Sequence, residues 1–91
     1  MGNVAASIHL ALQAALAPLA LQVVDDSAKH AGHAGARAQG ESHFTVRIVS
    51  EKFAGLNRVA RHRLVYDALK DQFAMGLHAL AIDAKTPQEI L

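Results

Sequence analysis

A single proline interrupts the longest uncharged segment near the start of this chain and limits how that segment can fold. Residues Val4 to Val24 carry no formal charge, and Pro18 lies among them. Proline removes a backbone donor and clashes with the preceding helical turn, so it would break one continuous helix across the segment. A membrane span needs such a helix, and the basic region that opens a signal peptide is missing as well. The sequence therefore predicts a helix that ends at Pro18 and a strand after it.

Two kinds of apolar spacing support this division. Helical intervals separate Ile8, Leu12, Ala15 and Leu16. They predict an amphipathic helix from about Val4 to Ala17. Residues 19–24 alternate instead with a period of two and precede an Asp-Asp-Ser turn, which predicts a half-buried strand.

The second half of the chain repeats both patterns. Residues 44–49 alternate and predict a second strand. Asn57 is a suitable N-cap and Gly76 a suitable C-terminal cap, so one long helix is expected from about Asn57 to Met75. A third strand over residues 77–82 follows. One face of this strand is expected to carry His78, Leu80 and Ile82.

These elements give the order αββαβ, which predicts an α+β fold with helices on one face of a three-stranded sheet. A length of 91 residues leaves room for a single domain, residues 1–91. Its ends, residues 1–3 and 88–91, are expected to be flexible. The connection over residues 26–42 is too long for a hairpin turn, and a connection of this length is usually functional or disordered.

Histidine stands out in the composition, because the chain has six histidines and no cysteine. Three of them, His30, His33 and His43, lie within 14 residues. Without thiols the chain forms no disulfide and no thiolate zinc site. Imidazole binds iron, copper and zinc, but two or three imidazoles leave an iron-sulfur cluster incomplete, so the other ligands must come from a partner. The alternative is an Ala/Gly-rich insert whose histidines bind nothing.

His78 is the strongest single candidate, because it directly follows the helix-strand junction and can project from the edge of the sheet. The alternative is an imidazole satisfied by a backbone carbonyl. Enzymatic motifs are missing: the sequence has no nucleophile elbow, no Walker loop and no H-E-x-x-H pair. We therefore expect a protein that is not an enzyme.

A basic patch is the best nucleic-acid signal in the chain. It consists of Lys52, Arg58, Arg61, His62 and Arg63. Nine Lys and Arg against eight Asp and Glu leave a net charge of only +1, and the patch has no stacking aromatic residue, so the signal is weak. The alternative is a solvated helix face on which Arg63 pairs with Asp67.

Six segments together resemble the BolA family, over about Leu12 to Pro87. They are Val-Val-Asp-Asp-Ser at 23–27, His-Ala-Gly-His-Ala-Gly at 30–35, Gly-Glu-Ser-His-Phe-Thr-Val at 40–46, Phe-Ala-Gly at 53–55, Arg-Val-Ala-Arg-His-Arg-Leu-Val-Tyr at 58–66 and His-Ala-Leu-Ala-Ile at 78–82. The Arg-His-Arg helix and the His-Ala-Leu strand at this separation form a specific combination.

The resemblance implies a KH-like (class II) fold, which is described as αββααβ when the long helix is split. It also implies a monothiol glutaredoxin as partner and a 2Fe-2S cluster shared with that partner and with glutathione. His78 matches the strand ligand of the family, and the second ligand belongs to the long loop, where His30 and His33 are rivals. The isolated chain is expected to hold no cofactor.

Three functions follow as hypotheses. The first is an adaptor in iron-sulfur cluster handling and iron homeostasis, which supplies these imidazoles. The second, implied by regulatory members of the family, is a DNA-binding transcriptional regulator of morphology and stress response that uses the stretch from Lys52 to Arg63. The third is an interaction module without metal. We expect a cytoplasmic protein that avoids membranes and is a monomer or weak dimer when free.

Overall fold

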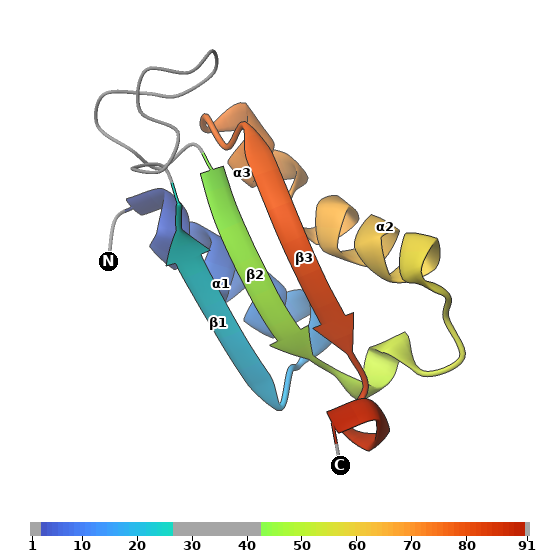
Figure 1. Ribbon diagram of the computed structural model, residues 1–91. Helices are drawn as coiled ribbons and strands as arrows, with labels where there is room; N and C mark the ends of the chain where they lie inside the picture. The colour runs from blue at the N-terminus through green and yellow to red at the C-terminus, as the bar shows by residue number, and fades with distance from the viewer. Residues whose placement is uncertain (1–2, 27–42, 91) are drawn as a thin grey trace.

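The computed structural model describes residues 3–26 and 43–90 and shows helices gathered on one face of a three-stranded sheet (Figure 1). The elements in chain order are α1 (Asn3–Leu16), β1 (Ala20–Asp25), β2 (His43–Val49), the 3-10 helix η2 (Glu51–Phe53), α2 (Arg58–Ala68), α3 (Lys70–Ala74), β3 (Ala79–Lys85) and the 3-10 helix η3 (Pro87–Ile90). The fold class is α+β, as predicted. The KH-like assignment stays a prediction.

The sheet has the order β1-β2-β3 and is mixed. β1 runs antiparallel to β2, whereas β3 runs parallel to it. Parallel neighbours need a crossover connection, and α2 with α3 forms it here. The registers place Gln22, Arg47 and Asp83 in one row across the sheet and set Ala79 beside His43.

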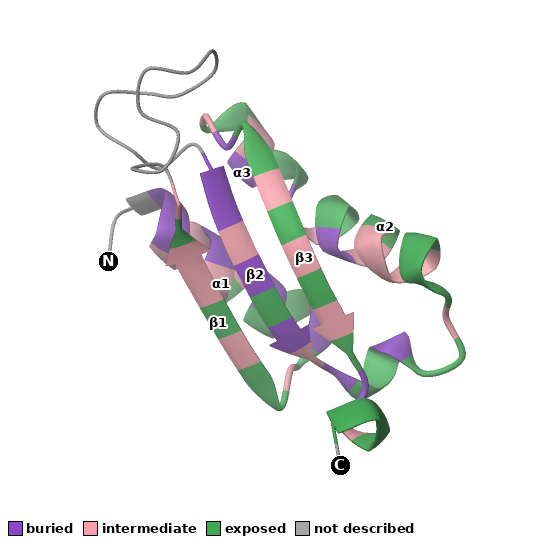
Figure 2. Cartoon of the chain, in the orientation of Figure 1, coloured by how far each residue is buried: buried purple, intermediate pink, exposed green. Residues whose placement is uncertain are grey.

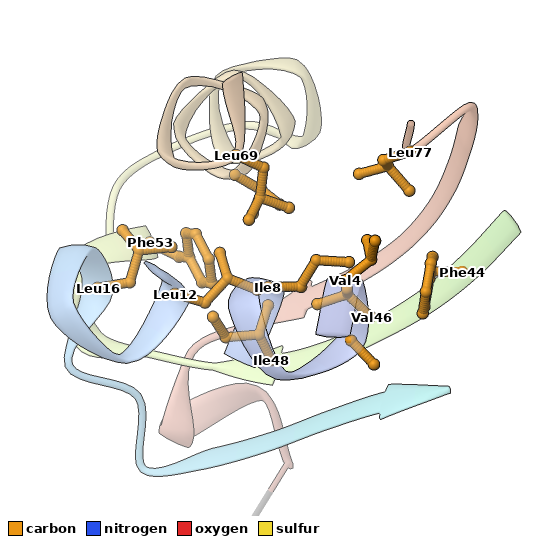
Figure 3. Close-up of a cluster of buried hydrophobic side chains, with 12 residues drawn as sticks. Val4, Ile8, Leu12, Leu16, Phe44, Val46, Ile48, Phe53, Leu69 and Leu77 are labelled. Carbon is orange, nitrogen blue, oxygen red and sulfur yellow. The ribbon is translucent and has the colours of Figure 1, made fainter. Parts of the chain in front are cut away.

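Alternation along the strands buries one face of the sheet and leaves the other open (Figure 2). The buried face is formed by Leu21, Val23, Phe44, Val46, Ile48, Leu80, Ile82 and Ala84. Against it pack Ile8 and Leu12 of α1, which are fully buried, together with Phe53 of η2 (Figure 3). The stripe predicted for α1 is confirmed for Ile8, Leu12 and Leu16, which are buried, and is wrong for Ala15, which is exposed.

Ser50 ties four elements together at the end of β2. Its buried hydroxyl donates to Leu16 O at 2.7 Å and accepts from Lys52 N, while its own N–H donates to Lys85 O. The Ser50 side chain thus satisfies a carbonyl at the C-terminal end of α1. Directly after this end, Ala17 takes a positive φ of 43° before Pro18.

The single long helix predicted from Asn57 to Met75 is wrong, because the chain breaks it at Leu69 into α2 and α3. Leu69 has φ −109° and ψ 13°, and its N–H is shared between Val65 O and Tyr66 O. Such shared bonds are common at helix ends. The Leu69 side chain is fully buried and projects into the core (Figure 3). The observed order is αββααβ, with two additional 3-10 helices.

The third strand begins later than predicted and extends further, over Ala79–Lys85. Leu80 and Ile82 face the core, but His78 precedes the strand and is exposed, so the prediction that these three residues share a face is wrong for His78. The reason is Leu77, which is buried in the core and takes the inward direction directly before His78.

The two ends of the described chain lie at opposite ends of the sheet (Figure 1). Residues 87–90, which overlap the end predicted to be flexible, form η3. Within residues 3–26 and 43–90, no helix combines the length and the apolar character that a membrane crossing requires.

Leu69→Ala is expected to lower the free energy of unfolding by about 2–5 kcal/mol, because it removes a fully buried side chain at the joint between α2 and α3. Urea denaturation followed by circular dichroism measures the change. The matched control is Leu10→Ala on α1, where the side chain is 66% exposed and a change within about 0.5 kcal/mol is expected. Equal effects at both positions would contradict this description of the core.

Candidate functional site

The end of the sheet at which β2 and β3 both begin holds the strongest predicted site residue. His78 is exposed and lies in the short turn between α3 and β3. The turn is built by a Schellman motif: Leu77 N donates to Gln72 O at 3.2 Å and Gly76 N donates to Phe73 O at 3.3 Å. Gly76 takes φ 119°, which only glycine adopts readily, so its predicted capping role is confirmed.

Burial of one neighbour directs the His78 side chain outward. Leu77 is 4% exposed and anchors the turn in the core, so the next side chain points away from the helices. No described residue forms a hydrogen bond with the His78 imidazole; its one ring contact among them is with His43. The alternative of a backbone-satisfied imidazole finds no support in the described residues.

His43 lies next to His78, although the sequence analysis did not select it as a ligand. The two ring centroids are 5.4 Å apart, with the planes tilted by 56°. His43 is the first residue of β2 and is 8% exposed. The pairing of His43 with Ala79 in the parallel register explains the contact, because it places the residue before Ala79 at the same end of the sheet. Only the register of β2 and β3 reveals that the two histidines are neighbours.

A hollow of about 260 Å³ adjoins the pair. It is lined by Asp26, His43, Phe44, Ala79, Leu80 and Ala81. The small side chains of β3 leave this space open. Asp26 closes one side, where its N–H donates to His43 O at 2.7 Å and its carboxylate accepts from the Thr45 hydroxyl. These bonds fix the backbone that carries His43.

The spacing of the two imidazoles suits a shared metal ion. Imidazole nitrogen binds zinc at about 2.0–2.1 Å, so two rings on one tetrahedral ion have centroids about 5 Å apart. The observed separation of 5.4 Å is close to this value. Nowhere in residues 3–26 and 43–90 do three or more His, Asp or Glu side chains gather that could hold a metal. The pair by itself would therefore supply at most two of the four ligands of a tetrahedral site.

The other two predicted ligands, His30 and His33, lie outside the described residues, as does most of the 26–42 connection. Their assignment stays a prediction.

The predicted basic patch divides into residues with different surroundings. Arg61 is 15% exposed, and its guanidinium donates to Leu56 O at 2.9 Å, to Ala84 O at 3.1 Å and to Glu89 at 2.6 Å. Lys52 lies on η2 and donates to Ala15 O at 3.0 Å. Arg58, Arg61 and His62 line one groove beside β3, whereas Arg63 is exposed elsewhere on α2. The structure does not bring the five residues together.

The Glu89 carboxylate holds the guanidinium of Arg61 in place. The sequence analysis did not select Glu89. The hydrogen bond from Arg61 and the one from Thr86 N–H lower the pKa of Glu89 from 4.5 to about 2. The bond from Thr86 N–H to the Glu89 carboxylate is one half of a capping box at the start of η3, and Glu89 N donates to the backbone carbonyl of Thr86. The Thr-x-x-Glu spacing at the end of the sequence was the available signal.

Comparison with known proteins adds a family. The BolA-like protein family model matches residues 12–89. The chain is 48% identical over 94 residues to SufE-like protein 1, chloroplastic/mitochondrial, of Arabidopsis thaliana, with 99% of this chain and 25% of that protein covered. It is 49% identical over 89 residues to Protein BOLA1, chloroplastic, of the same plant, with 96% and 56% covered. The chain therefore spans about a quarter and about half the length of these relatives.

A solved structure shows the same fold. The BolA domain of SufE1 from Arabidopsis thaliana superimposes on this chain with a TM-score of 0.88 at 48% identity, and 98% of each chain is covered.

Glu89→Gln is expected to destabilise the protein near neutral pH and to flatten its response to acid. The folded-state pKa lies below the unfolded one, so the contribution of Glu89 is complete above about pH 4.5 and is lost as the pH falls toward 2. Urea denaturation at several pH values should show the difference between wild type and variant shrinking over this window. Glu51→Gln, at an exposed carboxyl in η2, serves as control and should keep the wild-type response; a difference that grows in acid would contradict the assignment.

Proposed function

Because the chain belongs to the BolA-like protein family, we propose that it acts as an adaptor in iron-sulfur cluster handling and iron homeostasis. In this role it binds a monothiol glutaredoxin and supplies two imidazoles to a 2Fe-2S cluster shared with that partner and glutathione. It does no catalysis of its own.

One observation carries the proposal: an exposed imidazole and a second imidazole lie 5.4 Å apart at one end of the sheet. A chain without cysteine offers iron no thiolate, and histidine is the nitrogen ligand that iron-sulfur centres accept. In the proposal this pair supplies two of the four ligands, and the thiolates, which a chain without cysteine lacks, come from the partner and from glutathione. The donor set therefore fits a cluster held jointly with a thiol-bearing partner.

The two histidines have different tasks in this proposal. His78 is exposed, which lets a partner approach it without rearrangement of the core. His43 is buried and fixed by the backbone of β2, so it defines where the second nitrogen lies. We take His43 as the companion of His78 on the basis of this geometry, while His30 and His33 remain the rival candidates that the family resemblance gives for the second ligand.

Ligation by imidazole has an electronic consequence. A cluster held by two histidines and two thiolates carries less negative charge than one held by four thiolates, and its reduction potential is higher. The chain contributes to this by replacing anionic ligands with neutral ones.

The DNA-binding alternative has no comparable observation in its favour. Arg61, the central cation of the predicted patch, is already bonded to two carbonyls and to Glu89. Lys52 is likewise bonded to Ala15 O, so the patch is not a continuous cationic surface.

The test is cluster binding by a complex of this chain with a cluster-loaded monothiol glutaredoxin, prepared without oxygen. Visible circular dichroism of the wild-type complex is expected to differ from that of the glutaredoxin alone, because imidazoles replace two ligands. His78→Ala should abolish the difference between the two spectra. His43→Ala should weaken the affinity for cluster-loaded glutaredoxin at least about tenfold.

His62→Ala on α2 is the matched control, since it removes an imidazole outside the pair and should leave the spectrum unchanged. Spectra that are insensitive to both His78→Ala and His43→Ala would remove the proposed site. A complex that forms equally well without iron and shows no spectral change would instead indicate an interaction module without metal. If only His78→Ala acts, the second ligand is not His43.

A further inference from the structure

The outer edge of β3 has backbone groups that the sheet does not use. Ser50 N donates to Lys85 O, so the backbone of Lys85 faces β2. Successive residues of a strand direct their backbone groups to opposite sides. The backbone N–H and C=O groups of Leu80, Ile82 and Ala84 therefore point to the outer edge. β3 pairs with β2 alone in the described sheet, so this edge has no neighbouring strand there.

A side chain already binds one of these groups. The Arg61 guanidinium donates to Ala84 O at 3.1 Å, in the way that an N–H of a neighbouring strand would. The backbone groups of Leu80 and Ile82 have no hydrogen-bond partner among the described residues. Unpaired edges of this kind are templates for strand addition.

A groove of about 640 Å³ lies between this edge and α2. Its apolar lining comes from Leu56, Ile82 and Ala84, and its α2 side carries Arg58 and His62. A groove between an edge strand and a helix is the arrangement in which proteins bind extended peptides by strand addition.

The charges of the groove favour an acidic ligand. Glu89 is bound by Arg61 at 2.6 Å, and Asp83 lies 3.9 Å from Lys85, so both carboxylates of the lining have a basic neighbour. Arg58 forms no ion pair with any residue of the described ranges and is exposed. An added carboxylate is therefore attracted most strongly to the α2 side of the groove.

We propose that an extended, acidic segment of a partner protein binds in this groove and adds to the outer edge of β3 as a fourth strand. Its backbone pairs with Leu80 and Ile82, and every second side chain faces α2, where carboxylates meet Arg58 and His62. The groove reaches Lys85 and Glu89 at the far end of β3 from His78. This binding does not depend on the cluster proposal.

The test uses a synthetic peptide of about eight residues in which valine and glutamate alternate, titrated into the isotope-labelled full chain. Nuclear magnetic resonance is expected to show shifts and slower hydrogen exchange at the amides of Leu80 and Ile82. Arg58→Glu should weaken the binding at least about tenfold, because it reverses the charge that faces the peptide. The matched control is Arg63→Glu on the same helix, which lies outside the groove and should leave the affinity within about twofold.

A second peptide of the same sequence, N-methylated at alternate residues, separates strand pairing from charge attraction and should not bind. Equal binding of both peptides would overturn strand addition, as would shifts confined to the edge of β1. No binding of either peptide up to about millimolar concentration would also overturn the proposal. If a short DNA duplex shifts these amides and the peptide does not, the groove is a nucleic-acid site and the proposal is wrong.

Discussion

Parallel pairing of β2 with β3 is the constraint on which the candidate site depends. The register sets Ala79 beside His43, and this alone brings two histidines from distant parts of the chain to one end of the sheet. The crossover through α2 and α3 must return the chain to the starting end of β2, and the Schellman motif at Gly76 makes that return tight. Burial of Leu77 then leaves His78 no direction but outward.

Much of the fold could be predicted from local patterns. The alternation at residues 44–49 and the helical stripe that includes Ile8 and Leu12 identified a strand and a helix correctly, because each pattern reflects burial of one face. Local patterns do not reveal the break at Leu69, since neither glycine nor proline marks it, and only the family resemblance pointed to a split helix. The break becomes visible only in the structure, as a change of backbone conformation at a buried leucine.

The site was less accessible to sequence reasoning. His78 could be selected because Gly76 signals a helix end before it. His43 could not, because its nearness to His78 depends on the direction and register of strand pairing, which a local pattern does not contain. Arg61 shows the opposite failure: among neighbouring basic residues it looks like a surface cation, yet Glu89 and two carbonyls surround it.

β3 links the two surfaces of interest, with His78 before its first residue and the Arg61 contact near its last. A strand cannot slide by a single position without turning its inward side chains outward, so the apolar packing of Leu80 and Ile82 locks it in place. The histidine end and the arginine end are therefore held at a fixed separation on opposite ends of one strand, which leaves room for two different proteins to contact this chain at once.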